Sequence, residues 1–280
     1  MKLLITGSQG MLGTDLVRAA ADAGHQLESV PRARADITDA PAVDDAVRRA
    51  RPDVVINCAA WTDVDGAESS PAAASAVNVT GAANVARAAA RCGAWTIHIS
   101  SDYVFDGSKR APYVESDRVA PLSQYGRSKL KGELAVAAQA PESHTIVRSS
   151  WLFGVAGKCF PDTILRLASE RDQLTVVDDQ VGCPTFTGHL AAALVELAGA
   201  RIPGVLHVAA TGQCSWYGFA RAIAERAGVE CELRPGTTAD LGRPAPRPAY
   251  SVLGTERSAP RLPDWREGLD QFMSTYAHAS

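Results

Sequence analysis

The feature that most restricts the fold of this chain is a glycine-rich turn close to its N-terminus. The apolar stretch KLLIT at 2–6 runs directly into TGSQGMLG at 6–13, with glycines at 7, 10 and 13. A glycine triplet between a buried strand and a helix is typical of dinucleotide-binding folds. We expect Gly7 to permit the tight turn, Gly10 to let the backbone approach a pyrophosphate, and Gly13 to allow close helix–strand packing.

The first two-thirds of the chain alternate short apolar runs with alanine-rich amphipathic stretches. Strands are predicted at 2–6, 25–30, 54–60, 96–101 and 144–150, and helices at 11–23, 40–50, 72–91 and from 125 onward. This alternation predicts a parallel sheet covered by helices on both faces. The predicted fold class is therefore α/β, with a Rossmann-type doubly wound sheet.

After Ser150 the regular alternation stops. Helices are predicted at 160–171, 187–199 and 216–228, strands at 174–180 and 204–210, and a loop-rich cap at 234–263. We expect residues 1–150 to form a dinucleotide-binding domain, which 187–210 rejoins. Residues 151–280 are expected to form mainly a smaller, interleaved substrate-binding domain.

Composition argues against several classes of function. The net charge of −3 gives no basic surface for nucleic acid. No apolar run reaches the roughly 18 residues of a membrane helix, and the first strand leaves no room for a leader. The six cysteines form no C-x-x-C pair, which is typical of reduced thiols. A cytoplasmic protein is expected, with no nucleic-acid partner, no membrane partner and no metal ligands.

The residues after the second predicted strand bear on the choice of dinucleotide. NAD sites usually carry an acidic residue about twenty positions after the glycine turn. Here Arg32 and Arg34 lie near the strand end, and Asp36 follows. An arginine there suits the 2′-phosphate of NADP, and Asp36 is placed to reach the adenine. NADP(H) is therefore the preferred cofactor, with NAD(H) possible.

The stretch YGRSK places Tyr125 and Lys129 on one face of a helix. Alone, such a pair is most often an ordinary surface feature. Here the fourth strand ends in SSDYVFDG, so Ser101 lies at the sheet edge where ligands bind. Ser101, Tyr125 and Lys129 are therefore expected to meet beside a nicotinamide.

These three residue types suit the reduction of a ketone. Addition of hydride leaves an alkoxide that needs a proton and hydrogen-bond donors. Tyr125 can give the proton, and Lys129 is expected to lower the pKa of Tyr125 from about 10 and to bond the nicotinamide ribose. Ser101 would donate a hydrogen bond to the substrate oxygen.

Longer motifs resemble those of one family. HISSDYVFDG, PLSQYGRSKLKGE, VRSSWLFG, DDQVGCPT and RPAYSVL occur in order over nearly the whole chain. They resemble dTDP-4-dehydrorhamnose reductases, within the extended short-chain dehydrogenase/reductase superfamily. The resemblance implies NADPH-dependent reduction of the C4 ketone of dTDP-4-dehydro-β-L-rhamnose to dTDP-β-L-rhamnose, with Tyr125 as proton donor.

The resemblance implies roles for further residues. The catalytic trio is Ser101, Tyr125 and Lys129. Together with the glycine turn, the expected cofactor contacts are Gly7, Gly10, Met11, Leu12, Gly13, Arg32, Asp36, Ile37, Ala59, Ala60, Trp61, Asn78, Tyr125 and Lys129. The expected substrate contacts are Ser101, Asp102, Trp151, Arg247 and Ser251. Trp61 and Trp151 are equally interpretable as core aromatics, and Asn78 matches a residue that supports the active site.

The chain departs from the family pattern at several positions. Ser101 stands where Thr is frequent, and Tyr250 replaces the Asn of RPANS. Some members bind magnesium through glutamates at a dimer interface, whereas the matching positions here are Asp15, His189 and Arg266. Magnesium is therefore left open, and a monomer or a homodimer is expected.

Other functions stay open beside this one. The substrate can be another dTDP-4-keto-6-deoxyhexose of natural-product biosynthesis, for example in dihydrostreptose formation. A nucleotide-sugar dehydratase or epimerase is less favoured, because Asp102 and Tyr103 follow Ser101 where such dehydratases have Asp and Glu. A non-catalytic NADP-binding subunit is disfavoured, because Tyr125 and Lys129 are both present.

Overall fold

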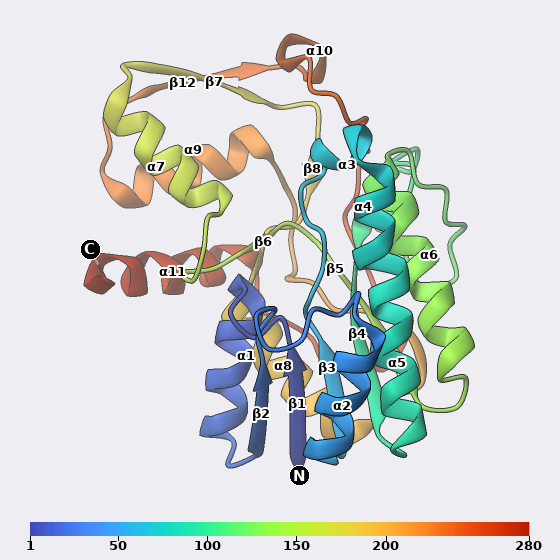
Figure 1. Ribbon diagram of the computed structural model, residues 1–280. Coiled ribbons are helices and arrows are strands. Elements are labelled where there is room, and N and C mark those ends of the chain that lie inside the picture. Colours follow the sequence, from blue (N-terminus) through green and yellow to red (C-terminus); the bar gives the residue numbers. More distant parts are fainter. Residues whose placement is uncertain (280) are drawn as a thin grey trace.

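Six parallel strands form the central sheet, in the order β10-β5-β4-β3-β1-β2 (Figure 1). In chain order they are β1 (Lys2–Thr6), β2 (Gln26–Val30), β3 (Val54–Asn57), β4 (Trp95–Ser101), β5 (His144–Ser149) and β10 (Gly204–His207). This computed structural model describes residues 1–279. The predicted α/β fold class is confirmed.

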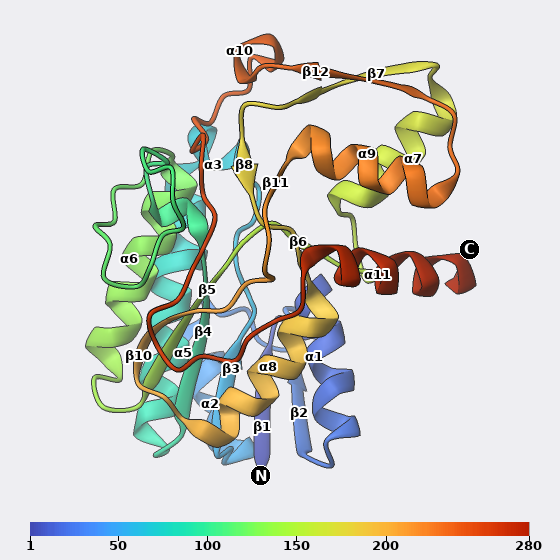
Figure 2. The ribbon, with the colours of Figure 1, turned by 180° about the vertical axis from the view of Figure 1, so that it is seen from behind.

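Helices cover both faces of this sheet (Figures 1 and 2). One face carries α1 (Met11–Asp22) and α8 (Thr187–Ala200), and the other carries α2 (Ala40–Ala50), α5 (Ala82–Arg91) and α6 (Gln124–Gln139). Strand residues alternate between the faces. Leu3 and Ile5 pack with α1 and α8, whereas Leu4 packs with α2 and α5.

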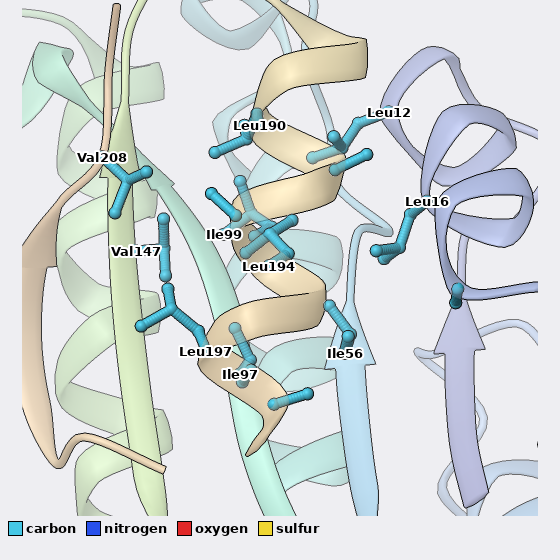
Figure 3. Close-up of a cluster of buried hydrophobic side chains, with 14 of the residues drawn as sticks. Leu12, Leu16, Ile56, Ile97, Ile99, Val147, Leu190, Leu194, Leu197 and Val208 are labelled. Atoms are coloured by element: carbon cyan, nitrogen blue, oxygen red, sulfur yellow. The ribbon is translucent and has the colours of Figure 1, made fainter. Parts of the chain in front are cut away.

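The core under α8 is purely aliphatic in its centre. Leu190, Leu194 and Leu197 of α8 point onto strand residues such as Ile97 and Val147 (Figure 3). Thus α8, which begins only at Thr187, completes the helical cover of strands that lie within the first 150 residues.

A second lobe lies beyond the carboxyl ends of the strands (Figures 1 and 2). Its elements are β6 (Leu152–Phe153), α7 (Phe160–Glu170), β7 (Gln173–Val177), β8 (Val181–Gly182), β9 (Thr185–Phe186), β11 (Cys214–Ser215), α9 (Trp216–Ala227), β12 (Glu232–Gly236), α10 (Thr238–Leu241) and α11 (Trp265–Ala279). Phe153, Phe219 and Phe272 centre its own core. The sequence predicts a loop-rich cap at 234–263. The first residues of this range instead form the end of β12, which pairs with β7, and then the short helix α10.

One predicted helix is interrupted. The sequence predicts a helix over 72–91, but the structure has α4 (Pro71–Ser75), a π-helical turn η1 (Ala76–Gly81) and α5, with α3 (Gly66–Ser69) before them. Such π turns often occur at functional sites. The expected strand at 54–60 also ends early, at Asn57, whose side chain accepts hydrogen bonds from Thr6 and from the Ala59 amide. Within residues 1–279, no helix is both long and apolar enough for a membrane span.

The α8 core should be sensitive to truncation. Leu194 is 0% exposed in this core, whereas Leu134 of α6 is 64% exposed. Leu194→Ala leaves a cavity and should lower the free energy of unfolding by about 3 kcal/mol. Leu134→Ala should change it by less than about 0.5 kcal/mol. Denaturant unfolding of both variants checks this, and equal effects would contradict the described packing.

Candidate active site

The three glycines of the first turn face different surroundings. Gly7 has a φ of +65°, and a Cβ there would lie 2.6 Å from the Ala59 amide nitrogen. A Cβ on Gly13 would lie 2.2 Å from the Gly7 carbonyl oxygen. Gly10 differs, since only that same oxygen lies within 4 Å of its Cβ position, at 3.3 Å. Gly7 and Gly13 are thus required by contacts within the protein, while the space beside Gly10 is open to a ligand.

The N-terminus of α1 has the character of a phosphate site. Gly10 is its N-cap residue, no side chain caps the helix, and its first turn holds no acidic residue. The first backbone N–H groups of a helix lack partners inside that helix, and they favour anions. Met11 and Leu12 open this helix, so the residues present fit the pyrophosphate of a dinucleotide, and their contact with a cofactor stays a prediction.

A cavity of about 620 Å³ adjoins this turn, and Arg34 lies on its wall. Ser8, Gln9, Thr14, Val17, Ser29 and Pro31 are the other lining residues. Arg34 bonds the Ser29 carbonyl at 3.3 Å. Arg32, the residue expected at the cofactor, does not line the cavity. Its side chain is 85% exposed and pairs with Asp36. The arginine at this cavity is therefore Arg34.

The two expected adenine contacts are engaged with the protein itself. Asp36 accepts hydrogen bonds from the backbone and hydroxyl of Thr38, which hold the pKa of its carboxyl below the usual value. The Ile37 side chain is buried and lies against Gly81. No free Asp36 carboxylate or exposed Ile37 side chain therefore faces a ligand.

Asn78 joins the loop after β3 to the helix that carries Tyr125. Its side-chain oxygen accepts from the Trp61 amide at 2.8 Å, and its nitrogen donates to the Trp61 carbonyl and to Ser128 Oγ, at 3.2 and 2.9 Å. Asn78 is 1% exposed. Asn78 therefore ties Trp61, which follows Ala59 and Ala60, to α6, and its contact with a cofactor stays a prediction.

The structure brings Ser101 and Tyr125 together at the end of β4. The Tyr125 hydroxyl lies beside Ser101, and Ser101 Oγ donates to Asp102 Oδ1 at 3.0 Å. Asp102 opens a short 3-10 helix, η2 (Asp102–Val104). The Tyr125 phenol, the Ser101 hydroxyl and a buried carboxyl group therefore follow one another at this end of the strand.

Lys129 lies one turn further along α6 but bonds elsewhere. Its Nζ donates to the Ile99 carbonyl at 2.7 Å. Burial lowers the pKa of Lys129 to about 8, with the charge of Glu133 opposing. Burial raises the pKa of Tyr125 to about 12. The expectation that Lys129 lowers the pKa of Tyr125 is therefore wrong for this structure, because desolvation dominates and the ammonium group faces a carbonyl.

The start of α6 fixes the Tyr125 ring beside η2. Ser123 caps the helix by accepting from the Gly126 amide at 3.1 Å. A Cβ on Gly126 would lie 2.2 Å from the Tyr103 carbonyl oxygen. Only glycine therefore allows this approach, which sets the Tyr103 and Tyr125 rings edge to face, with centroids 5.7 Å apart.

A buried ion pair anchors the middle of α6. Arg148 of β5 donates two parallel hydrogen bonds to the Glu133 carboxylate, at 2.9 and 2.7 Å. Ser100 Oγ donates to the same carboxylate at 2.5 Å. The helix that carries Tyr125 and the strand that carries Ser101 are thus tied together from inside.

Trp151 and Ser251, two further expected substrate residues, each lie against other parts of the protein. Trp151 has a φ of +46° and stacks on Trp216, with ring centroids 3.6 Å apart. Only glycine fits at 182, because a Cβ there would lie 2.3 Å from the Trp151 ring. Ser251 is 1% exposed and lies beside the Asp102 carboxyl. Trp151 is therefore held in a strained conformation, and Ser251 supports Asp102.

Arg247 contacts Asp65, a residue that sequence reasoning missed. Its guanidinium pairs with Asp65 at 2.9 Å and lies beside the Tyr103 side chain. Asp65 stands in WTDVDGAE, which no motif singled out. Tyr103 lies inside SSDYVFDG and could have been found from its place directly after Ser101 and Asp102.

Of the three positions expected to match the family's magnesium site, Asp15 and Arg266 are engaged with other residues, whereas His189 Nδ1 is buried without a hydrogen-bond partner in the part of the chain that the structure describes. Asp15 accepts from Thr187 Oγ1 at 2.5 Å, and Arg266 pairs with Asp264 at 3.2 Å. Among the described residues, no group of three or more His, Cys, Asp or Glu side chains is arranged to hold a metal. The expected oligomeric state, a monomer or a homodimer, stays a prediction.

Comparisons with known proteins agree with this geometry. The chain matches the model of the "RmlD substrate binding domain" over residues 1–278. A dTDP-4-dehydrorhamnose reductase of Mycobacterium tuberculosis (strain ATCC 25618 / H37Rv) is 44% identical, over 100% of this chain and 94% of that protein. A probable dTDP-4,6-dihydroxy-2-methyloxan-3-one 4-ketoreductase of Streptomyces antibioticus is 41% identical, over 96% and 93%. The structure of a dTDP-4-dehydrorhamnose reductase from Bacillus anthracis in complex with NADP has a TM-score of 0.95 at 36% identity, over 98% of this chain and 99% of that chain.

Burial of Asp102 predicts a pH-dependent stability. Burial raises the pKa of Asp102 from 3.8 to about 7, although hydrogen bonds from Ser251 and Ser101 oppose the shift. The folded protein therefore holds an extra proton between about pH 4 and pH 7, so the free energy of unfolding falls as pH rises through this range. Asp102→Asn does not titrate, so its stability relative to wild type should increase from about pH 5 to about pH 8. Thermal unfolding at both pH values tests this, and a constant difference would contradict it.

Proposed function

Because the chain belongs to the RmlD family, whose relatives include dTDP-4-dehydrorhamnose reductases, we propose that it reduces the C4 ketone of dTDP-4-dehydro-β-L-rhamnose to dTDP-β-L-rhamnose. The observation that carries this is the juxtaposition of Tyr125 and Ser101 at the carboxyl edge of the sheet, next to a turn fitted for a dinucleotide. Ligands of open parallel sheets bind at this edge.

The proposed cofactor is NADPH, which supplies hydride when it is bound. The amides of Met11 and Leu12 would hold its pyrophosphate, and the open space at Gly10 lets the backbone approach. Arg34 would pair with the 2′-phosphate from the cavity wall. The NADP complex of the Bacillus anthracis relative supports this choice, and NADH stays possible as a weaker donor.

Tyr125 is the proposed proton donor. Its pKa of about 12 keeps the phenol protonated at neutral pH, so the group is an acid in its resting form. Ser101 has one proton, which it donates to Asp102 in this structure, and it would turn that proton to the ketone oxygen, where negative charge develops. Tyr125 and Ser101 lie beside each other before substrate binds, which reduces the cost of placing them.

Lys129 and the residues of the second lobe have supporting roles in this proposal. The Lys129 ammonium, fixed on the Ile99 carbonyl, would bond the nicotinamide ribose. Asp102 would meet the sugar hydroxyls, and Trp151 would pack against the sugar ring. Arg247 and Ser251 would lie toward the nucleotide end of the substrate.

A second candidate is reduction of another dTDP-4-keto-6-deoxyhexose. The Streptomyces antibioticus relative is named for a different 4-keto sugar at nearly the same identity. Turnover of the rhamnose precursor and of a second 4-keto sugar, measured side by side, separates the two. The candidate with the higher kcat/KM is the substrate.

The role of Tyr125 is tested by Tyr125→Phe. The variant keeps the ring but removes the proton donor, so kcat should fall by roughly a hundredfold or more. The loss of NADPH absorbance with dTDP-4-dehydro-β-L-rhamnose generated in situ gives the rate. NADPH affinity, followed by fluorescence, should stay within about threefold of wild type. A variant with wild-type kcat would exclude Tyr125 as the acid.

Cofactor preference is tested by a matched arginine pair. Arg34→Ala should raise KM for NADPH by about tenfold or more and leave KM for NADH nearly unchanged, because only NADPH carries the 2′-phosphate. Arg32→Ala is the control, since that side chain is 85% exposed away from the cavity. If the Arg32 variant shows the larger effect, the assignment of Arg34 is wrong.

A further inference from the structure

The carboxylate of Asp65 accepts hydrogen bonds from residues 243–247, a segment far along the chain. Arg247 donates to both of its oxygens, at 3.0 and 2.9 Å. The Ala245 amide donates to Oδ1 at 3.1 Å, and Arg243 donates to Oδ2 at 3.3 Å. A carboxylate that accepts a two-pronged arginine contact fixes the plane of that guanidinium as well as its position.

This contact joins the two lobes. Asp65 immediately precedes α3 on the sheet lobe, and Arg247 lies in the segment that follows α10, which descends beside α3 (Figure 2). The Arg247 side chain is 12% exposed and the Asp65 side chain 27%. The Arg243 side chain, by contrast, is 56% exposed. The pair with Arg247 is therefore the sheltered one, and the one that salt and water weaken least.

The contact continues toward the reaction site. The Arg247 guanidinium also lies beside the Tyr103 side chain. The Tyr103 ring meets the Tyr125 ring edge to face, with centroids 5.7 Å apart and an interplanar angle of 82°. Tyr103 also directly follows Ser101 and Asp102 in the chain. One connected set of contacts thus leads from Asp65 to the residue proposed to give the proton.

Asp65 remains charged throughout the neutral range. The hydrogen bond from Arg247 is the main cause that lowers the pKa of its carboxyl. An arginine without this partner would have to be ordered by the substrate itself, which weakens binding. The contact therefore preorganises Arg247 before any ligand arrives.

We propose that Asp65 is a positioning residue for the sugar nucleotide: its two-pronged ion pair holds Arg247 against Tyr103, so that both side chains stand ready for the substrate. This inference rests on the proposed function and adds to it a residue that touches neither substrate nor cofactor. Its expected signature is a loss of substrate affinity with little change in the chemical step.

The first test is Asp65→Asn, which keeps the shape and removes the charge. KM for the 4-keto sugar nucleotide should rise by about tenfold, while kcat changes by less than about threefold. NADPH affinity should be unchanged, because the glycine turn is elsewhere. Arg243→Ala is the matched control. It removes the exposed partner of the same carboxylate and should change KM by less than about twofold.

A double variant shows whether Asp65 acts through Arg247 or independently of it. If Asp65 acts through Arg247, then Asp65→Asn should add less than about twofold to the KM of Arg247→Gln. Fully multiplied effects would overturn the proposal. An unchanged KM in Asp65→Asn would also overturn the proposal. A lower thermal unfolding midpoint together with equal losses in kcat and NADPH affinity would overturn it too, because that pattern indicates general damage to the fold.

Binding of dTDP, measured by calorimetry, keeps this inference distinct from the proposed reaction. dTDP carries the nucleotide end without the ketone. If wild type binds dTDP about tenfold more tightly than Asp65→Asn but does not reduce the sugar, the reaction assignment fails and the role of Asp65 stands. If both bind dTDP equally, the role of Asp65 fails whatever the reaction.

Discussion

The geometry of the reaction site depends on one buried ion pair, between Glu133 of α6 and Arg148 of β5. Both side chains are about 5% exposed or less, and Ser100 completes the carboxylate's hydrogen bonds. Removing one partner of such a pair leaves an uncompensated charge, which costs about 3–5 kcal/mol. Since Glu133 lies on the helix of Tyr125, and Ser100 precedes Ser101, this pair fixes the catalytic helix against the sheet.

The two lobes meet at Tyr125 through separate sets of contacts. From the sheet side, the phenol lies beside Ser101, which donates to Asp102. From the second lobe, Arg247 lies beside Tyr103, whose ring contacts that of Tyr125. Because the site is assembled from both lobes, a change in the second lobe can alter substrate recognition while the buried anchoring pair of the sheet lobe is kept.

Features with local signals could be predicted from the sequence. The glycine turn, the strand–helix alternation and the approach of Ser101 to Tyr125 follow from short motifs and periodicity. Tertiary effects could not be predicted. Arg32 and Arg34 each pair with a carboxylate, of Asp36 and Glu28 respectively, but only Arg34 lines the cavity. The pKa of Tyr125 is set by burial that a single sequence does not reveal. The Asp65–Arg247 pair spans 182 residues, and no pattern in one sequence connects its partners.

The late recruitment of α8 and β10 has a consequence for synthesis on the ribosome. Strands β1 to β5 emerge first, but the helix that covers their face beside α1 is α8, and the neighbour of β5 is β10. Until about residue 207 has left the exit tunnel, the nascent chain presents an uncovered aliphatic face and an unpaired strand edge. The first 150 residues therefore cannot bury this face or pair this strand edge until α8 and β10 have been synthesised.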